Sequence, residues 1–226
     1  MKPIRDLIVA TALALTALPA LADKIVTYTI DPTHTQVYFS WNHAGFSSPG
    51  AVFREVTGII QGNHDVPENS TVEVSIPVRS VDSFVPLLNE FLINSGDYFK
   101  TAEYPVITFK STGIRDVQRK RRTFTLLGNL TVNGITKPVK LLAKANTIGP
   151  HPFYDNGAAA GFEAATTIRR TDFNMGKYTP IVSDDLTVRI TVEAIEEKAY
   201  QKALEKQAAE QKAAAQKAAT QKAVTP

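Results

Sequence analysis

The stretch Thr123–Val132, TFTLLGNLTV, decides the fold class of this chain. Its even-numbered positions hold Phe, Leu, Gly, Leu and Val, whereas four of its five odd-numbered positions are polar. This period of two is typical of a β-strand with one buried face. Asn133-Gly134 follows directly, and this dipeptide is strongly favoured in two-residue hairpin turns. The stretch therefore predicts one strand of an antiparallel sheet.

The same alternation recurs between Lys24 and Ile195, interrupted by turn residues. We expect short antiparallel strands near 24–30, 35–43, 52–62, 70–78, 105–116, 122–132, 138–148, 160–170 and 186–195. Such a series predicts an all-β fold, either a sandwich or a closed barrel. Closure would remove the exposed strand edges, and an eight-stranded barrel has room for one elongated ligand. The alternation alone leaves both architectures open.

One stretch between the strands has a different period. Leu87, Leu88, Phe91 and Leu92 recur at helical spacing after Pro86. Proline is common in the first turn of a helix, and this spacing places the apolar side chains on one helix face. The sequence therefore predicts one short amphipathic helix inserted into the series of strands.

The N-terminus has the pattern of a secretory signal peptide. Lys2 and Arg5 precede an apolar run from Leu7 to Leu18, and Ala-Leu-Ala ends at Ala22. The run is shorter than the roughly 20 residues that a spanning helix needs, and the small residues suit cleavage. We expect residues 1–22 to be removed, which places the protein in the periplasm of a bacterium. A retained N-terminal anchor is the alternative.

The C-terminal residues 196–226 form a low-complexity tail rich in Ala, Lys, Gln and Glu. Gln-Lys-Ala recurs at 211, 216 and 221, a repeat of five residues. Five residues rotate a helix by about 500°, so successive repeats face different directions and no apolar stripe forms. We expect a solvated, partly helical tail that packs against nothing. A spacer or a weak contact with the cell envelope is the alternative.

Composition narrows the function classes for the barrel domain expected over residues 23–195. The chain has no cysteine, which excludes disulfides, thiol catalysis and cysteine metal sites. The formal net charge of +3 comes from the two ends, so residues 23–195 are neutral. Nucleic-acid binding leaves a basic face as its footprint, so no nucleic-acid partner is expected.

Four segments in order resemble a known family. They are residues 28–35 (YTIDPTHT), 97–109, 128–134 (GNLTVNG) and 168–173 (IRRTDF). Together they resemble the YceI-like family of periplasmic proteins. The resemblance implies a lipocalin-like antiparallel barrel of eight strands, capped by the helical insertion, with a polyisoprenoid inside and a homodimer as the assembly. Asn174 departs from the family pattern, which has Gly there, although Asn tolerates positive φ.

Candidate ligand-binding residues follow from strand parity and from this resemblance. Val37, Phe39, Trp41 and His43 share one face of an expected strand, and that face should be internal. The alternative is an ordinary packed core, and a lone histidine there is commonly a hydrogen-bonded core residue. The candidate set is Val37, Phe39, Trp41, His43, Leu88, Phe91, Phe99, Phe109, Phe124, Leu126, Leu130, Phe162, Ile168 and Arg170.

Arg170 has two competing interpretations. Arg170 and Asp172 share parity at the end of an expected strand, so an ion pair between them could close the barrel. Alternatively, the guanidinium of Arg170 binds the polar head group of the ligand. Asp31, His34 and Asp184 could belong to the same rim.

The remaining motifs carry little chemistry. Residues 119–122, RKRR, are expected in a hairpin turn, either simply solvated or in transient contact with anionic phospholipid. The four histidines lack metal-ligand spacing, and no catalytic motif is present. We therefore expect no metal, no cofactor and no catalysis, and a carrier of an isoprenoid lipid or quinone. The alternatives are a cryptic enzyme using the barrel as its pocket and a structural envelope protein acting through its tail.

Overall fold

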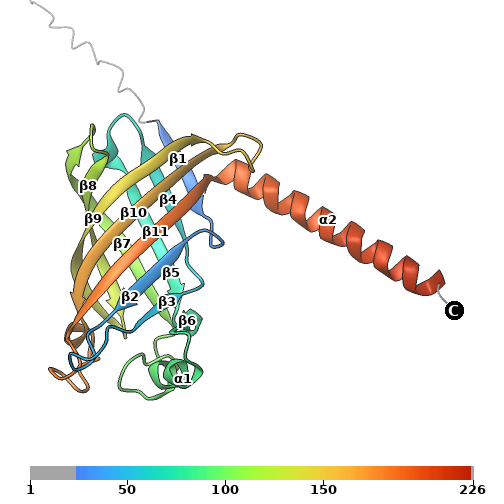
Figure 1. Ribbon diagram of the computed structural model, residues 1–226. Coiled ribbons are helices and arrows are strands. Elements are labelled where there is room, and N and C mark those ends of the chain that lie inside the picture. The colour runs from blue at the N-terminus through green and yellow to red at the C-terminus, as the bar shows by residue number, and fades with distance from the viewer. Residues whose placement is uncertain (1–23, 225–226) are drawn as a thin grey trace, which may run out of the picture.

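The computed structural model describes residues 24–224, so the expected signal peptide lies outside the described residues. The described chain forms one sheet of eleven strands with two α-helices (Figure 1). The strands are β1 (Ile25–Ile30), β2 (Gln36–Ser40), β3 (Gly50–Phe53), β4 (Thr57–Asn63), β5 (Thr71–Pro77), β6 (Val81–Asp82), β7 (Val106–Gln118), β8 (Thr123–Val132), β9 (Ile135–Pro150), β10 (Ala158–Arg169) and β11 (Asp185–Glu196).

The sheet closes into an antiparallel barrel. Neighbouring strands follow the order β1-β4-β5-β7-β8-β9-β10-β11, and β1 pairs again with β11 through Tyr28–Glu196 and Ile30–Ala194. The three remaining strands extend the barrel wall, because β2 pairs with β11 and with β3, and β3 pairs with β6. The wall is therefore eight strands wide, and the prediction of an eight-stranded barrel is confirmed.

The first three strands of the barrel are each interrupted. β2 continues β1 after a break at residues 31–35. β3 and β4 are separated at residues 54–56, and β5 and β6 at residues 78–80. Asp31-Pro32 stands at the first break, and proline cannot donate a ladder hydrogen bond. The expected strand at 35–43 thus ends at Ser40, and the expected strand at 52–62 is two strands.

Two turns adopt the positive backbone φ angles that their asparagine and glycine residues predict. Asn133 and Gly134 join β8 to β9 with φ of 51° and 73°, the positive values of a tight hairpin turn. Asn174 has φ of 59° and ψ of 34°, so it occupies the left-handed region where the family usually has glycine.

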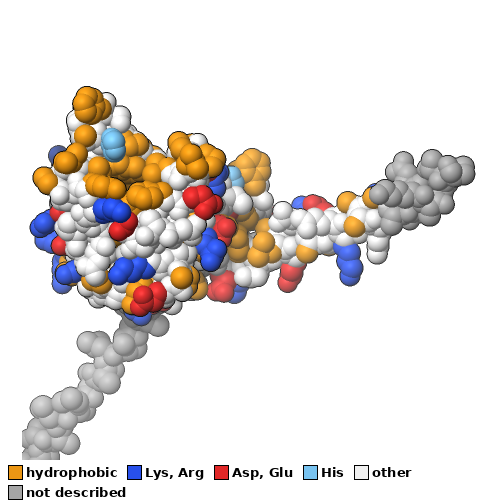
Figure 2. Space-filling view, turned by 90° about the horizontal axis from the view of Figure 1, so that it is seen from below, with side chains coloured by type: hydrophobic (Ala, Val, Ile, Leu, Met, Phe, Trp, Pro, Cys, Tyr) orange, Lys and Arg blue, Asp and Glu red, His pale blue; other side chains and the backbone are white. Residues whose placement is uncertain are grey.

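The inserted helix, α1 (Pro86–Asn94), lies at the lower end of the barrel (Figure 1). Leu92 is buried in the core, whereas Leu87 is 83% exposed. Figure 2, seen from below, shows apolar side chains gathered on this end of the molecule. They include the exposed Phe46, Phe84 and Ile181 from three different loops.

The tail is the helix α2 (Glu197–Val224), which leaves the upper part of the barrel and projects away from it (Figure 1). Its first two turns do contact the β9–β10 loop, residues 151–157. Tyr200 stacks on Tyr154 with ring centroids 6.4 Å apart, and Lys202 pairs with Asp155 at 2.9 Å. The expectation of a tail that packs against nothing is therefore wrong for this part. Neither α2 nor α1 combines the length and apolarity required to cross a membrane.

Candidate ligand-binding cavity

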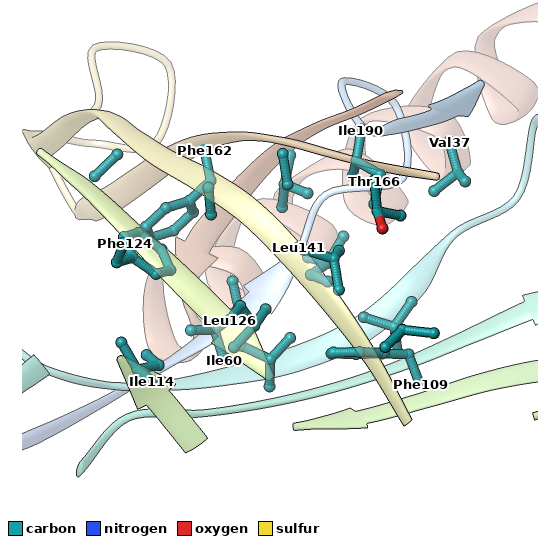
Figure 3. Close-up of a pocket in the computed structure, with 18 of the residues that line it drawn as sticks. Val37, Ile60, Phe109, Ile114, Phe124, Leu126, Leu141, Phe162, Thr166 and Ile190 are labelled. Atoms are coloured by element: carbon teal, nitrogen blue, oxygen red, sulfur yellow. The ribbon is translucent and has the colours of Figure 1, made fainter. Parts of the chain in front are cut away.

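The barrel encloses a cavity of ≈ 540 Å³. Its wall is made by alternate residues of the strands, since every second side chain of a barrel strand points inward. Figure 3 shows Phe124 of β8, Phe162 of β10 and Ile60 of β4 around this space, with Thr166 as the polar side chain among those labelled. A volume in this range is typical of sites for small molecules and lipids.

Nine of the candidate residues line the cavity, and they come from both halves of the chain. Phe124 and Phe162 face each other edge-on with ring centroids 6.4 Å apart. The nine are Val37, Phe39, Phe99, Phe109, Phe124, Leu126, Leu130, Phe162 and Ile168.

Trp41 and His43 lie outside the cavity lining, because β2 ends at Ser40 and the strand alternation ends with it. Trp41 stacks on Phe39 at 5.9 Å, behind the cavity wall. His43 is exposed and bridges to Ser47 and Val182 in the loops of the lower end. The structure thus shortens the inward stripe to Val37 and Phe39.

The two helix candidates also lie outside the lining. Leu88 packs against the core cluster, and Phe91 is 37% exposed and tilts against Tyr98 at 5.2 Å. The helix covers the lower end without reaching the cavity. Phe99, in the segment after the helix, is the residue of this region that reaches it.

Arg170 is buried in the lower end, 3% exposed, and lies outside the cavity lining. Its guanidinium donates to the carbonyl oxygens of Ser183 (2.7 Å), Lys177 (2.9 Å), Val182 (2.8 Å) and Met175. The structural interpretation is therefore wrong in its partner, because these carbonyls take the place of Asp172. The guanidinium also lies away from the cavity, where the head-group interpretation requires it. Arg170 organises the β10–β11 loop, residues 170–184.

Buried aromatic and sulfur side chains fill the lower end of the barrel. Phe39, Phe53 and Phe99 form a ring cluster with centroid distances of 5.4, 5.8 and 6.4 Å. Phe173 and Met175, which are 1% and 4% exposed, belong to the same cluster. The cavity therefore ends against a packed core at this side.

The cavity opens at the upper end, where its lining changes from apolar to polar. Polar residues of strand ends and loops replace the apolar strand residues there, and we call this end the mouth. The mouth residues are Asn63, His64, Ser70, Gln118, Arg119, Arg122, Thr123 and Asn146. Arg119 donates to the carbonyl of Asp65 at 2.7 Å, and Arg122 donates to that of Asn146. The predicted basic hairpin thus borders the mouth.

One polar pair reaches from the mouth into the barrel. The Tyr28 hydroxyl and His64 Nε2 share a hydrogen bond of 2.8 Å. Burial, together with the nearby Glu196 carboxylate, raises the pKa of Tyr28 above its ordinary value, so the hydroxyl stays protonated. This arrangement suits a ligand with a long apolar body inside and a polar end at the mouth.

Sequence reasoning missed much of the apolar wall contributed by β4, β5, β7, β9 and β11. Strand parity was the signal that could have found these residues, once the strand boundaries were known. They include Ile60, Val74, Ile76, Ile107, Ile114, Leu141, Val188 and Ile190.

A second polar cluster lies on the outer face of the barrel. Asp31, His34 and Glu193 bring their ligand-type atoms within 4.8 Å of one another. Asp184, which we grouped with Asp31 and His34, lies instead at the lower end, where it pairs with Arg169 at 2.9 Å. The expected rim around Arg170 therefore includes Asp184, and the expectation is wrong for Asp31 and His34.

Comparison with known proteins identifies relatives of this barrel in sequence and in structure. Residues 28–194 match the YceI-like domain family. A UPF0312 protein of Azotobacter vinelandii is 32% identical over 196 residues, covering 86% of this chain and 100% of the relative. The crystal structure of Burkholderia cenocepacia BcnA superposes with a TM-score of 0.64 at 21% identity, over 73% of this chain and 98% of BcnA. A polyisoprenoid-binding domain from Saccharophagus degradans gives a TM-score of 0.56 at 14% identity, over 76% and 99%.

Proposed function

The chain belongs to the YceI-like family, and from this premise we propose that it binds one long isoprenoid lipid or quinone in its barrel. We further propose that it carries or stores this ligand in the periplasm, without cofactor and without chemical turnover. The observation that carries the proposal is the closed barrel with a cavity of ≈ 540 Å³, apolar inside and polar at its mouth. The description of the Saccharophagus domain as polyisoprenoid-binding supports the same ligand class.

The energetics favour a ligand held by its shape. Burial contributes about 0.8 kcal/mol per CH₂ group, so each five-carbon isoprene unit adds roughly 3 to 4 kcal/mol before any cost. Several units would exceed the affinity ceiling of about 20 kcal/mol. Most of this gain must be offset, because the ligand leaves a membrane that is equally apolar. The net affinity is then modest, and the ligand can exchange.

Native mass spectrometry of protein purified from its own periplasm tests the proposal. We expect one apolar ligand of several hundred daltons or more per barrel, and its mass should stay constant during incubation with the protein. A tightly packed barrel without any ligand after gentle purification would contradict the carrier function. A change in the mass of the bound molecule would instead favour the enzymatic alternative.

We also propose that the mouth makes transient contact with anionic membranes through residues 119–122. Lys120 and Arg121 are exposed at the tip of this hairpin, beside the mouth, and each basic residue near such a surface is worth about 1 kcal/mol. Replacing all four basic residues with glutamine should abolish flotation with anionic vesicles. If flotation survives, and is lost instead in Phe46→Ser with Ile181→Ser, the lower end is the docking face and this proposal is wrong.

The cellular location and the assembly are tested separately. Fractionation should place the mature chain, beginning at Asp23, in the periplasm, as the signal-peptide pattern of residues 1–22 predicts. Recovery of the chain with its N-terminal segment attached to membranes would contradict this. Light scattering after gel filtration should give twice the monomer mass, as the family resemblance implies, and a monomer mass would refute the homodimer.

A further inference from the structure

The outer face of the barrel holds a cluster of metal-ligand side chains that the proposed function does not use. Asp31 lies in the break between β1 and β2, His34 follows it, and Glu193 lies on the neighbouring strand β11. Ile30 and Val192 line the cavity, so Asp31 and Glu193 point to the opposite, outer side of the wall. His151 of the β9–β10 loop lies against Glu193.

The spacing of these ligand atoms is close to the spacing around a small tetrahedral metal ion. His34 Nδ1 is hydrogen-bonded to Asp31 Oδ2 at 2.9 Å and lies 3.7 Å from Glu193 Oε1. His151 Nε2 lies 3.2 Å from the same Glu193 oxygen. Zinc bonds of about 2.0 to 2.2 Å in a tetrahedron separate the ligand atoms by about 3.3 to 3.6 Å. Shifts of a few tenths of an ångström would therefore accommodate the ion.

The surroundings of Asp31 resemble the outer shell of a metal ligand. Asp31 is 1% exposed, and its Oδ1 accepts hydrogen bonds from the Thr33 amide (2.9 Å) and hydroxyl (2.7 Å). The Tyr154 hydroxyl donates to Oδ2 at 2.9 Å. Such partners hold a ligating carboxylate in one orientation, so Asp31 is already positioned for a cation.

Glu193 supplies a second, independent observation. Its Oε1 is buried and accepts no well-aligned hydrogen bond within the described residues, although His151 Nε2 lies 3.2 Å away. A buried carboxylate oxygen without a well-aligned donor is costly, and a metal ion would satisfy it. Asp31 and Glu193 together also place two carboxylates beside two imidazoles, a donor set whose charge a divalent cation neutralises.

We propose that Asp31, His34 and Glu193 bind one divalent transition-metal ion such as Zn²⁺, with His151 as the neighbouring fourth candidate. The imidazole ligands select a transition metal over Ca²⁺ or Mg²⁺, which prefer oxygen ligands. When the ion binds, His34 gives up the hydrogen bond from Nδ1 to Asp31, binds the ion through the lone pair of Nδ1 and keeps its ring proton on Nε2. Its side chain is 62% exposed, which gives the ion access from solvent and leaves room for a coordinated water.

The site would have a structural effect, because it connects three separate parts of the chain. Asp31 and His34 belong to the interrupted first strand, Glu193 to β11, and His151 to the β9–β10 loop. Tyr154 of this loop also stacks on Tyr200 of α2. An ion bound here would therefore hold the loop and the start of the tail helix against the barrel wall.

Calorimetric titration of tag-free, EDTA-dialysed protein with ZnCl₂ tests the proposal. We expect one Zn²⁺ per chain and no comparable binding of Ca²⁺. His34→Ala should weaken Zn²⁺ binding by at least about tenfold, since it removes a direct ligand. His43→Ala, which removes an exposed histidine at the opposite end, is the matched control and should bind as the parent does.

Two further measurements make the result decisive. Zn²⁺ should raise the melting temperature of the parent but not of His34→Ala, and Co²⁺ should give the visible absorption of a tetrahedral site in the parent alone. Unchanged Zn²⁺ affinity in His34→Ala, or the absence of stoichiometric binding, would overturn the proposal. Ligand content measured in the same samples separates this result from the lipid proposal, because His34 lies outside the cavity.

Discussion

Arg170 is the first residue after β10, where the strand gives way to a 3₁₀ turn (Arg170–Phe173). Strand parity therefore no longer describes where its side chain points. The side chain lies among the carbonyl oxygens of the loop that follows, and four of them accept its hydrogen bonds. The role of Arg170 therefore depends on where β10 ends, and the ends of strands and helices are what a sequence pattern predicts least well.

Arg170→Gln should lower the free energy of unfolding by about 3 to 5 kcal/mol, because it leaves several buried carbonyls without a donor. Chemical denaturation of the ligand-free protein measures this loss. Arg169→Gln is the matched control: Arg169 pairs with Asp184 but is 64% exposed, so its loss should cost less than about 1 kcal/mol. Loss of ligand binding in Arg170→Gln without loss of stability would restore the head-group interpretation.

Gly128 occupies an inward position where a side chain would meet a cavity residue. A Cβ at this position would lie 2.3 Å from the Phe109 ring and 2.8 Å from the Lys110 carbonyl oxygen. The ring of Phe109 therefore uses the space that the glycine leaves open. The sequence shows an interruption of the apolar alternation here, but not which neighbour fills it.

Gly128→Ala should push the Phe109 ring toward the cavity and reduce the amount of ligand bound. Overpacking of this kind typically costs about 1 to 3 kcal/mol. Ligand content by mass spectrometry and the melting temperature measure the two effects. Gly113→Ala on the neighbouring strand is the control, because a Cβ there would meet nothing within 4 Å. Full ligand content in Gly128→Ala would show that Phe109 does not limit the cavity.

At the scale of elements, the sequence predicts the strands better than the places where they break. Alternation locates β7 to β11 within a few residues, and Asn133-Gly134 locates the β8–β9 turn. The breaks at 31–35 and 54–56 depend on contacts with distant residues. For example, Asp31 donates its amide to the carbonyl of Glu193. A pattern in nearby residues carries no information about such partners.

The tail helix α2 likewise has contacts with distant residues that its own sequence pattern does not predict. Its composition predicts a helix, and its five-residue repeat correctly offers no stripe for a coiled coil. The docking of its first turns depends on single contacts: Tyr200 on Tyr154, and Ala199 facing Gly157, where a Cβ on the glycine would lie 2.3 Å away. These contacts join residues that are more than forty positions apart in the chain, so the repeat gives no sign of them.

Two truncations separate the docked and the projecting parts of α2. Ending the chain after Lys206 should leave the melting temperature and the ligand content unchanged, because it keeps Tyr200 and Lys202. Ending it after Glu196 should cost about 1 to 2 kcal/mol, or roughly 2 to 8 °C for a domain of this size. Equal melting temperatures for both truncations would show that the first turns contribute nothing. Loss of bound ligand in either truncated protein would indicate that the tail contributes to function.

At the scale of the whole molecule, the alternation of a strand cannot distinguish a hollow barrel from a filled one. Inward residues such as Phe124, Leu126 and Leu141 are apolar in either case, and only the packing of all eight strands shows whether space remains. The family resemblance was therefore necessary to predict a cavity. The position of its mouth needed the structure, because it depends on which loops meet at one end.

An occupied cavity should stabilise the entire barrel by mass action. Protein stripped of ligand by denaturation and solvent extraction, then refolded, should melt below the protein as isolated. Ligand at about one hundred times its Kd adds about 2.7 kcal/mol, equivalent to roughly 5 to 11 °C for a domain of this size. Scanning calorimetry before and after adding back the extracted lipid measures the difference. Identical melting temperatures would indicate a filled interior that gains nothing from the lipid.

The packed lower end of the barrel has one more consequence. Because Phe99, Phe173 and Met175 block this end, a chain-shaped molecule passes through the mouth in a defined order. The end that goes in first is the last to come out. Under the proposed carrier function, the end of the ligand that leaves the donor last is therefore the end that the acceptor meets first. The barrel would then preserve the orientation of its ligand between donor and acceptor.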